Sequence, residues 1–373
     1  MNPFRHHHLL KLLSLYEGRR LSLPLVVNRY FREHKALGSK DRSWIGETAY
    51  NLMRWQGLWD YLGAQNWEER LKLSLERDPL DYQGREDIPP HIRVSFPEPF
   101  YSQLVRDHGE AAFQIALASN GPGPLTIRVN RLKGSREVLA GRLPFPTTPC
   151  KLSDVGLVVD RRRQLLALPE YQEGWFELQD EGSQWIAKMV GALPGEEGVD
   201  YCAGSGGKAL ALAAEMENKG QIYLGDNRAK MLYEARRRMR RAGVQNGQLL
   251  FGGIPERLKG RMDFVLVDAP CSGSGTLRRQ PDAKWRLKTC SALQRKIVAE
   301  ALPLLAPYGR LVYATCSLLS EENGDHLPYF ERELGLRVEG DPFQSLPTDG
   351  GMDGFYGVVL RRCDRGFGFC PPS

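Results

Sequence analysis

The sequence predicts an α/β fold, in which a mostly parallel sheet fills the C-terminal half and follows an all-helical segment and a small α+β module. Three observations support this prediction. Short apolar runs alternate with helical patterns beyond residue 173, which is typical of a parallel sheet. A glycine-rich turn joins one of these runs to a helix. Two later runs, at 265–267 and 311–314, are each followed closely by a cysteine, and the carboxyl ends of such strands are where ligands bind.

Length and composition limit the interpretation. A chain of 373 residues is long enough for two or three domains, and a hydrophobic content of 42% is ordinary for a globular protein. No apolar run approaches the roughly 18 residues that span a membrane, and the run at 9–15 is too short and too interrupted for a signal peptide. We therefore expect no membrane partner. A net charge of +6 permits a nucleic-acid partner without requiring one.

The seven cysteines include no closely spaced pairs of the kind that bind zinc, so no metal site is expected. A large chain with unpaired cysteines and no export signal indicates a reduced, cytoplasmic protein. Free cysteines are usually buried core residues. That structural role is expected for Cys150, Cys290, Cys363 and Cys370.

Residues 1–80 are expected to form a helical domain, because leucines and aromatic residues recur there at helical spacing. Taken by itself, this pattern, including the charged stretch at 30–42, is compatible with a plain helical bundle. From about 66 to 95 the chain is charged and weakly patterned, which is typical of a linker.

Residues 81–172 are expected to contain the rest of this linker and a small α+β module. Runs at 125–130, 155–159 and 165–168 predict strands, and 135–139 predicts a helix. A sheet of this kind could bind the bases of single-stranded RNA. A structural spacer is the alternative interpretation.

Residues 173–373 form the third expected domain. A strand at 199–202 runs into a glycine-rich turn and a helix, and the next strand, at 222–225, ends in Asp226. Glycines let the backbone approach a ligand, the helix N-terminus attracts an anionic group, and Asp226 would accept hydrogen bonds from ribose hydroxyls. The glycine-rich turn at 204–208 and Asp226 are therefore candidate cofactor-binding residues.

A nucleotide-binding unit of this kind is by itself compatible with NAD, FAD or S-adenosyl-L-methionine. The turn lacks the full dinucleotide spacing of glycines, and the cysteines that follow it have no role in hydride transfer. Both observations favour S-adenosyl-L-methionine as the cofactor.

The two thiols of Cys271 and Cys316 indicate covalent chemistry. Carbon 5 of cytosine is a poor nucleophile, but a thiolate that adds at carbon 6 makes carbon 5 able to accept a methyl group. A base must then remove the carbon-5 proton so that the thiolate can leave. Amine methylation needs no such thiol, so the cysteines favour carbon as the acceptor. Asp268 could bind the amidine edge of the cytosine, and the residues alone leave open which thiol attacks.

Several segments match one family pattern. They are 179–183 (Gln-Asp-Glu-Gly-Ser), 200–208 (Asp-Tyr-Cys-Ala-Gly-Ser-Gly-Gly-Lys), 268–275 (Asp-Ala-Pro-Cys-Ser-Gly-Ser-Gly), 279–285 (Arg-Gln-Pro-Asp-Ala-Lys-Trp), 313–317 (Tyr-Ala-Thr-Cys-Ser) with 321–323 (Glu-Glu-Asn), and 353–356 (Asp-Gly-Phe-Tyr). With them the chain resembles the Nol/Nop/Sun family of RNA 5-methylcytosine methyltransferases over at least 120–362. The stretch at 30–42 is similar to the NusB-type RNA-binding domain, and this layout resembles the Fmu/RsmB-like branch of the family.

The resemblance implies a class I methyltransferase domain with a Rossmann-like sheet, preceded by a NusB-like domain and an RRM-like module. It implies methylation of carbon 5 of a cytosine in RNA, with S-adenosyl-L-methionine as the donor and a covalent cysteine–C6 adduct. Cys316 would be the nucleophile, and Cys271 would assist product release. The cofactor and base pocket would be lined by Cys202, Ala203, Gly204, Ser205, Gly206, Gly207, Lys208, Asp226 and Asp268. The favoured substrate is 16S ribosomal RNA rather than transfer RNA, and a monomer is expected.

Some positions depart from the family pattern. Ser205 and Ala209 replace the usual proline and threonine, and Arg228 stands where many relatives have an acid. Phe251 begins a Phe-Gly-Gly stretch where an acid commonly lies near the adenine. Phe251 could stack on adenine instead, or the affinity for the cofactor could be lower.

Other functions stay open at this point. They are a transfer-RNA cytosine-5 methyltransferase, a non-catalytic RNA-binding ribosome-assembly factor on the same fold, and a methyltransferase for DNA or for a small-molecule nitrogen. The arginines at 236–241 indicate either a solvated helix face or contact with phosphates. Some of the basic residues at 278–288 are expected to contact the substrate backbone, whereas Trp285 is expected to pack.

Overall fold

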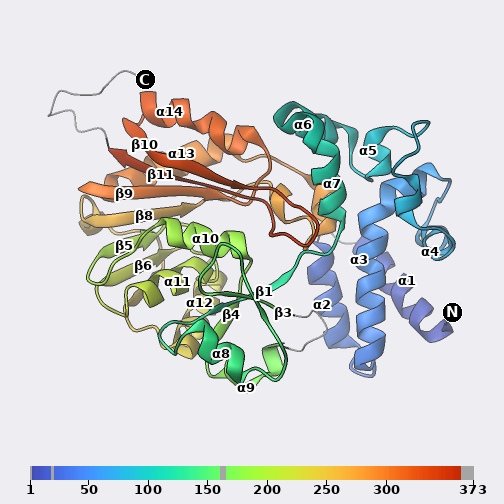
Figure 1. Ribbon diagram of the computed structural model, residues 1–373, viewed down its shortest axis with the longest axis horizontal. Helices are drawn as coiled ribbons and strands as arrows, with labels where there is room; N and C mark the ends of the chain where they lie inside the picture. Colours follow the sequence, from blue (N-terminus) through green and yellow to red (C-terminus); the bar gives the residue numbers. More distant parts are fainter. Residues whose placement is uncertain (1, 18–20, 160–164, 363–373) are drawn as a thin grey trace. The chain divides into compact units, whose positions relative to one another are not determined.

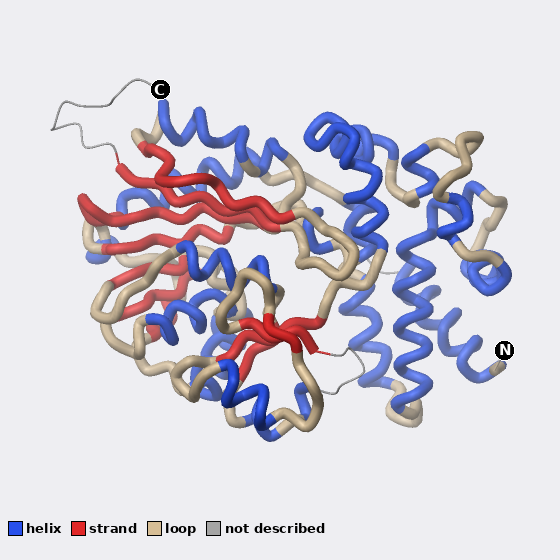
Figure 2. The backbone as a smooth tube through the Cα atoms, in the orientation of Figure 1, coloured by secondary structure: helices blue, strands red, loops and turns tan. Residues whose placement is uncertain are grey.

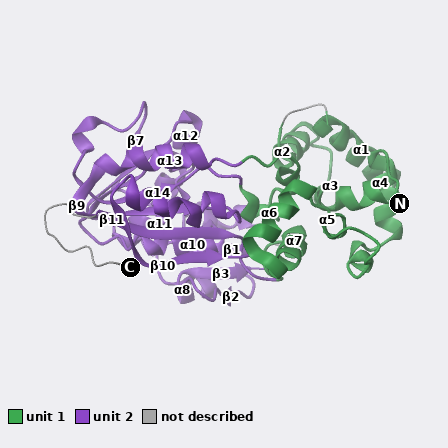
Figure 3. Cartoon of the chain, turned by 90° about the horizontal axis from the view of Figure 1, so that it is seen from above, with its two compact units in different colours: residues 1–123, 273–288, 347–349 green, residues 124–272, 289–346, 350–373 purple. Residues whose placement is uncertain are grey.

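The computed structural model describes residues 2–17, 21–159 and 165–362. The chain divides into two compact units, coloured separately in Figure 3. Unit 1 comprises 1–123, 273–288 and 347–349, and unit 2 comprises the remaining segments. The domain boundaries expected after residues 80 and 172 stay predictions. Cys363 and Cys370 lie outside the described residues, and so does the role expected for them.

Unit 1 is mainly helical. Its α-helices are α1 Pro3–Glu17, α2 Leu23–Glu33, α3 Ser39–Tyr61, α4 Trp67–Glu76, α5 Pro90–Arg93, α6 Glu98–His108 and α7 Ala112–Asn120. The linker expected at 66–95 is therefore wrong for α4. Asn66 caps this helix by accepting a hydrogen bond from the Glu69 amide at 3.0 Å, and Trp67 and Leu71 are buried. Its apolar face was too short to give a clear periodic pattern.

The segment at 273–288 completes the core of unit 1. The Asp282 carboxylate, which is fully buried, accepts a hydrogen bond from the Leu23 amide at 3.0 Å, at the beginning of α2. Lys284 is also buried, and its Nζ donates to the Arg54 carbonyl at 2.6 Å and to Asn120 Oδ1 at 2.8 Å. Residues distant in sequence thus close this helical core.

Unit 2 contains a small antiparallel sheet with the order β2-β3-β1-β4, drawn in red with the larger sheet in Figure 2. The strands are β1 Leu125–Val129, β2 Thr148–Pro149, β3 Gly156–Val159 and β4 Phe176–Leu178, accompanied by helices α8 Arg136–Arg142 and α9 Pro169–Gln172. The strand expected at 165–168 is wrong, because 165–167 form a 3₁₀ turn that leads into α9. The fourth strand, β4, is too short for its alternation to be recognised.

The larger sheet has seven strands in the order β10-β11-β9-β8-β5-β6-β7 (Figure 1). They are β5 Glu197–Asp200, β6 Gln221–Gly225, β7 Gly247–Leu250, β8 Met262–Asp268, β9 Leu305–Thr315, β10 Leu336–Ser345 and β11 Phe355–Arg362. The first five are parallel, whereas β11 is antiparallel to β9 and β10 is antiparallel to β11. The predicted α/β class with a mostly parallel sheet is confirmed.

Helices cover both faces of this sheet. α10 Glu181–Met189, α11 Gly207–Glu215 and α12 Ala229–Ala242 pack on one face, and α13 Ser291–Ala301 and α14 Leu327–Arg332 pack on the other. Successive residues of β8 serve the two layers alternately, with Phe264 and Leu266 in one core and Val265 and Val267 in the other. None of the helices in the described part of the chain is long and apolar enough to cross a membrane.

Candidate active site

The topology of the larger sheet brings the predicted site loops to one edge. The chain runs from β5 outward through β6 and β7, and then returns to place β8 and β9 on the other side of β5. Strand order therefore reverses between β5 and β8, and ligands of open α/β sheets bind beside the carboxyl ends of the strands at such a point. The glycine-rich turn, Asp226, Cys271 and Cys316 follow β5, β6, β8 and β9.

The turn after β5 adopts the conformation that its glycines allow. Gly204 and Gly206 have φ values of +52° and +79°, which a side chain would make unfavourable. The Gly206 amide donates to the Ala203 carbonyl at 2.8 Å, which closes the turn just before α11 begins at Gly207. The turn thereby brings its backbone to the N-terminus of a helix, where an anionic group is favoured.

Asp226 lies directly against this turn. Its Oδ2 accepts a hydrogen bond from the Gly204 amide at 2.9 Å, and its side chain is only 4% exposed. Arg228, the departure noted in the sequence, donates from Nε and Nη2 to the same carboxylate, each at 3.0 Å. Burial raises the pKa of Asp226, but the hydrogen bonds from Arg228 outweigh burial and leave it below its ordinary value. The binding of ribose hydroxyls by Asp226 stays a prediction.

The two expected thiols meet. Cys271 Sγ and Cys316 Sγ are 3.4 Å apart, although β8 and β9 deliver them from positions 45 residues apart in the chain. A hydrogen bond from the Cys271 thiol lowers the pKa of Cys316, against the effect of burial, and Lys208 adds to the lowering. Burial instead raises the pKa of Cys202 to about 12 and also raises that of Cys290. Of Cys202, Cys290 and Cys316, only Cys316 thus has an environment that lowers its pKa and favours the thiolate.

Lys208 connects two segments: the glycine-rich turn at 203–207, here named the cofactor turn, and the loop at 269–275 that carries Cys271, here named the first cysteine loop. Its Nζ donates to Asp268 Oδ2 at 2.6 Å, and the lysine is 7% exposed. Burial lowers the pKa of Lys208, but Asp268 outweighs burial and raises it overall. The ammonium group therefore stays charged, and holds the Asp268 carboxylate in one orientation.

Glu322, whose role the sequence did not predict, supports the first cysteine loop. Glu322 is fully buried and accepts hydrogen bonds from the Ser272 amide at 3.0 and 3.1 Å, and from the Cys290 amide at 2.9 Å. Asn323 supports the second loop, because its Nδ2 donates to the Ser317 carbonyl at 2.9 Å and its Oδ1 accepts from Thr315. In the sequence, the Glu-Glu-Asn motif at 321–323, shortly after Cys316, is the signal that indicates these two supporting residues.

Phe251 follows β7 and is 41% exposed. Its ring lies 5.1 Å from the ring of Tyr233, and the Arg236 guanidinium lies 5.5 Å from its centroid. An exposed aromatic face is thus present in the stretch that departs from the family pattern. The stacking of Phe251 on adenine stays a prediction.

Two of the basic residues expected to contact the substrate are buried. Arg278 donates to the Ala118 carbonyl at 3.1 Å, and Lys284 is held by Arg54 and Asn120. Arg278 and Lys284 therefore stabilise the core of unit 1, and contact of some of the other basic residues with the substrate backbone stays a prediction. Arg279, Arg286 and Lys288 are exposed. The expected packing of Trp285 is confirmed by its contact with the core of unit 1.

Comparison with known proteins adds independent findings. A family model described as 16S rRNA methyltransferase RsmB/F matches residues 189–358, and a second, described as a RsmF/B-like ferredoxin-like domain, matches 96–165. The chain is 33% identical over 298 residues to a probable ribosomal RNA small subunit methyltransferase B of Synechocystis, covering 76% of this chain and 67% of that protein.

A ribosomal RNA small subunit methyltransferase B of Pseudomonas syringae is 30% identical over 334 residues, covering 81% of this chain and 72% of the relative. Among solved structures, a methyltransferase homologue from Pyrococcus horikoshii is similar with a TM-score of 0.65 at 29% identity, over 76% of this chain and 99% of that one. These findings agree with the resemblance carried by the sequence motifs.

Proposed function

The chain belongs to the RsmB/F family of 16S rRNA methyltransferases, which use S-adenosylmethionine, and on that premise we propose that it methylates carbon 5 of a cytosine in small-subunit ribosomal RNA. The observation that supports this proposal is the 3.4 Å separation of Cys271 Sγ and Cys316 Sγ beside the Lys208–Asp268 pair. Methylation of a nitrogen would need neither thiol. The ribosomal substrate is inferred from the names of the two relatives.

In the proposed reaction the Cys316 thiolate adds to carbon 6 of the cytosine. The new S–C6 bond takes the electron pair of the thiolate, and the C5–C6 double-bond pair makes carbon 5 nucleophilic. When bound, S-adenosylmethionine would supply a methyl group on a sulfonium, and the electron pair of the broken S–CH3 bond would leave with the thioether. Asp268, held by Lys208, accepts a hydrogen bond from the exocyclic amino group and keeps the ring oriented.

Cys271 loses its own thiol proton to solvent and, as a thiolate, takes the proton from carbon 5. The C–H electron pair restores the C5–C6 double bond, the S–C6 bond breaks, and Cys316 leaves as a thiolate. Glu322 holds the amide of Ser272, the residue after Cys271, so that this thiol stays beside the adduct. The net change is transfer of one methyl group with release of one proton.

Single-cysteine variants test the proposal with small-subunit ribosomal RNA and labelled S-adenosylmethionine. Cys316→Ala should form no protein–RNA adduct and no methylated product. Cys271→Ala should slow release by about 100- to 10 000-fold, the usual range for a lost acid–base group, so that an RNA-linked protein species accumulates on a denaturing gel. Cys150→Ala, which removes a buried thiol of the small sheet, is the matched control.

Other outcomes have definite meanings. An adduct with Cys316→Ala and none with Cys271→Ala would show that Cys271 is the nucleophile and that Cys316 assists release. Undiminished turnover in both variants would exclude the covalent mechanism. Bisulfite mapping of the product locates the methylated cytosine. Transfer of methyl groups only to transfer RNA would show that transfer RNA, and not ribosomal RNA, is the substrate. Tight RNA binding without S-adenosylmethionine binding would support an assembly factor.

A further inference from the structure

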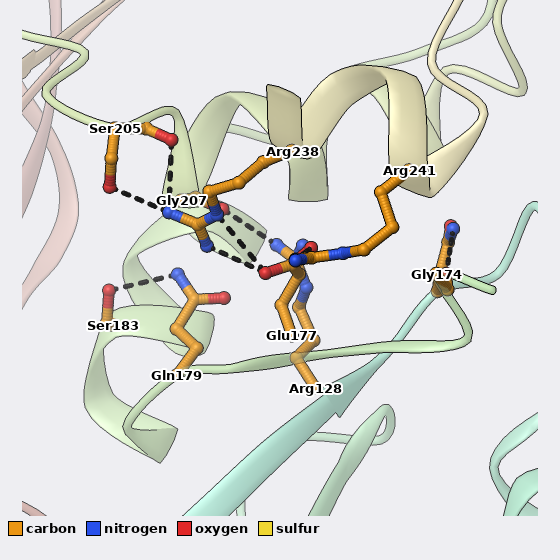
Figure 4. Close-up of polar contacts among 10 residues, drawn as sticks. Arg128, Gly174, Glu177, Gln179, Ser183, Ser205, Gly207, Arg238 and Arg241 are labelled. Carbon is orange, nitrogen blue, oxygen red and sulfur yellow. Dashed lines mark hydrogen bonds and ion pairs between the residues drawn. The ribbon is translucent and has the colours of Figure 1, made fainter. Parts of the chain in front are cut away.

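A buried cluster of charges joins the small sheet to the cofactor turn. Its centre is Glu177 on β4, whose side chain is only 3% exposed. Arg238 donates from Nη2 and Nε to Glu177 Oε2 at 3.0 and 3.2 Å, and Arg241 donates to Glu177 Oε1. Figure 4 shows both arginines reaching from α12 toward Glu177, with Arg128 of β1 beside it. A buried carboxylate is thus shared among guanidinium groups.

Two of these arginines also hold the backbone of the turn. Arg238 Nη1 donates to the Ser205 carbonyl at 3.0 Å and to Ser205 Oγ at 2.7 Å. Arg128 Nη1 donates to the Gly207 carbonyl at 3.0 Å. The guanidinium of Arg238 therefore bonds to Glu177 on one edge and to the turn on the other, as the dashed lines of Figure 4 mark.

The arginines of α12 serve two different environments. Arg236, Arg237 and Arg240 are exposed, whereas the side chains of Arg238 and Arg241 are 15% and 17% exposed. The latter two lie on the face of α12 that meets the small sheet. The sequence suggested a solvated face or a phosphate-binding face for the arginines at 236–241, and neither interpretation describes Arg238 and Arg241.

The end of α12 is fixed to the small-sheet side as well. Asn130 Nδ2 donates to the Gly174 carbonyl at 2.8 Å and to the Ala242 carbonyl at 2.7 Å. The backbones also approach closely, because a Cβ at Gly174 would lie 2.0 Å from the Arg241 carbonyl oxygen. These contacts hold the end of α12 against residues adjoining β1 and β4, so the position of Arg238 depends on the small sheet.

We propose that Arg238 and Arg128 are positioning residues for S-adenosylmethionine, through which the small sheet holds the Ser205–Gly207 turn in its binding conformation. A trans peptide points its carbonyl and N–H in opposite directions, so fixing the Gly207 carbonyl also fixes the Lys208 amide at the beginning of α11. Preorganising a turn in this way increases affinity because less conformational entropy is lost on binding. The inference rests on the cofactor turn of the proposed function.

Arg238→Met tests the inference without leaving Glu177 alone, because Arg241 still donates to that carboxylate. We expect the Kd for S-adenosylmethionine, measured by titration calorimetry on the full chain, to rise at least about tenfold, by analogy with residues that support metal ligands and alter metal affinity on this scale. The Kd for RNA and the single-turnover rate at saturating S-adenosylmethionine should change less than twofold. This split separates a positioning role from general damage to the fold.

Matched variants sharpen the result. Arg237→Met removes the neighbouring arginine, which is 79% exposed and pairs with Glu234, and should leave the Kd for S-adenosylmethionine unchanged. Ser205→Ala removes only the Oγ acceptor and should give a smaller rise than Arg238→Met. Arg238→Lys should recover part of the affinity, since one ammonium group cannot bond to both edges as the guanidinium fork does.

The possible failures are distinguishable. If the wild-type chain does not bind S-adenosylmethionine, the cofactor turn itself is wrongly assigned and the proposed function fails with it. If the wild type binds and Arg238→Met binds equally well, only the positioning role is overturned. A loss of RNA affinity with unchanged S-adenosylmethionine affinity would instead make Arg238 part of an RNA-binding face. If Arg238→Met does not fold, Ser205→Ala provides the test instead. An unchanged Kd for S-adenosylmethionine in Ser205→Ala would then overturn the inference.

Discussion

Asp200, at the carboxyl end of β5, shows how burial alters the charge of a single residue beside the site. It is 1% exposed, and its Oδ1 has no hydrogen-bond partner among the described residues. Burial, together with the negative charge of Asp268, raises its pKa to about 7, although Lys208 opposes both effects. Below neutral pH Asp200 is therefore protonated, while Asp268 keeps its partner Lys208.

Asp200→Asn tests this at the residue scale. Between about pH 4 and pH 7 the folded wild type keeps a proton that the unfolded chain has lost, so its free energy of unfolding should fall relative to that of the variant as the pH rises. The fall should total at most about 4 kcal/mol and should level off above the folded pKa. Urea unfolding at a series of pH values measures it. The exposed Asp341→Asn is the control, and a pH-independent difference for Asp200→Asn would contradict the assignment.

At the scale of elements, β5 is the strand on which the site depends, because it pairs with both β6 and β8. Gly198 of β5 lies opposite Phe264 of β8. A Cβ at Gly198 would lie 2.1 Å from carbons of the Phe264 ring, which is fully buried. Glycine within this strand thus makes room for a large core side chain.

Gly198→Ala should therefore destabilise unit 2. Neither the ring nor the central strand can move without disturbing its neighbours, so a loss of about 1–3 kcal/mol or more in the free energy of unfolding is expected. Gly141→Ala in α8 is the matched control, because nothing lies within 4 Å of its Cβ position. Chemical denaturation of the two variants gives the comparison, and equal stability of both would show that β5 and β8 are packed less tightly.

At the scale of the whole molecule, the chain does not run through its units in succession. It leaves unit 2 after Ser272, contributes 273–288 to unit 1, and returns to unit 2. Trp285 belongs to the core of unit 1, where a Cβ at Gly57 would lie 2.8 Å from its ring. The residues just after the first cysteine loop are therefore structural members of the helical unit.

A fragment of residues 1–123 should accordingly be less stable than unit 1 in the full chain. It lacks Asp282, which bonds to the beginning of α2, as well as Lys284 and Trp285, and the loss of buried side chains of this size costs roughly 3 kcal/mol or more. Helical circular dichroism should increase when a peptide of residues 273–288 is added. The same peptide with Trp285 replaced by alanine should have less effect. This organisation would be contradicted if the fragment folded cooperatively alone and neither peptide changed its helical circular dichroism.

The sequence by itself determined the class of the larger sheet, because alternating apolar runs and helical patterns are local signals of a parallel sheet. It also indicated Cys271 and Cys316 as partners, since the carboxyl ends of parallel strands meet at one edge. The sequence did not predict short elements such as α4 and β4, because three to ten residues give too little periodicity to distinguish a helix or strand from a loop.

Only the tertiary structure decided which charged residues are buried and what they touch. Arg238 and Arg237 are adjacent in sequence and identical in chemistry, yet one is held by Glu177 and Ser205 and the other is exposed. Lys284 and Glu322 would be expected at the surface from their charge alone, but partners distant in the chain enclose them. The physical reason is that burial of a charge depends on long-range partners that satisfy its hydrogen bonds, and local sequence carries no record of those partners.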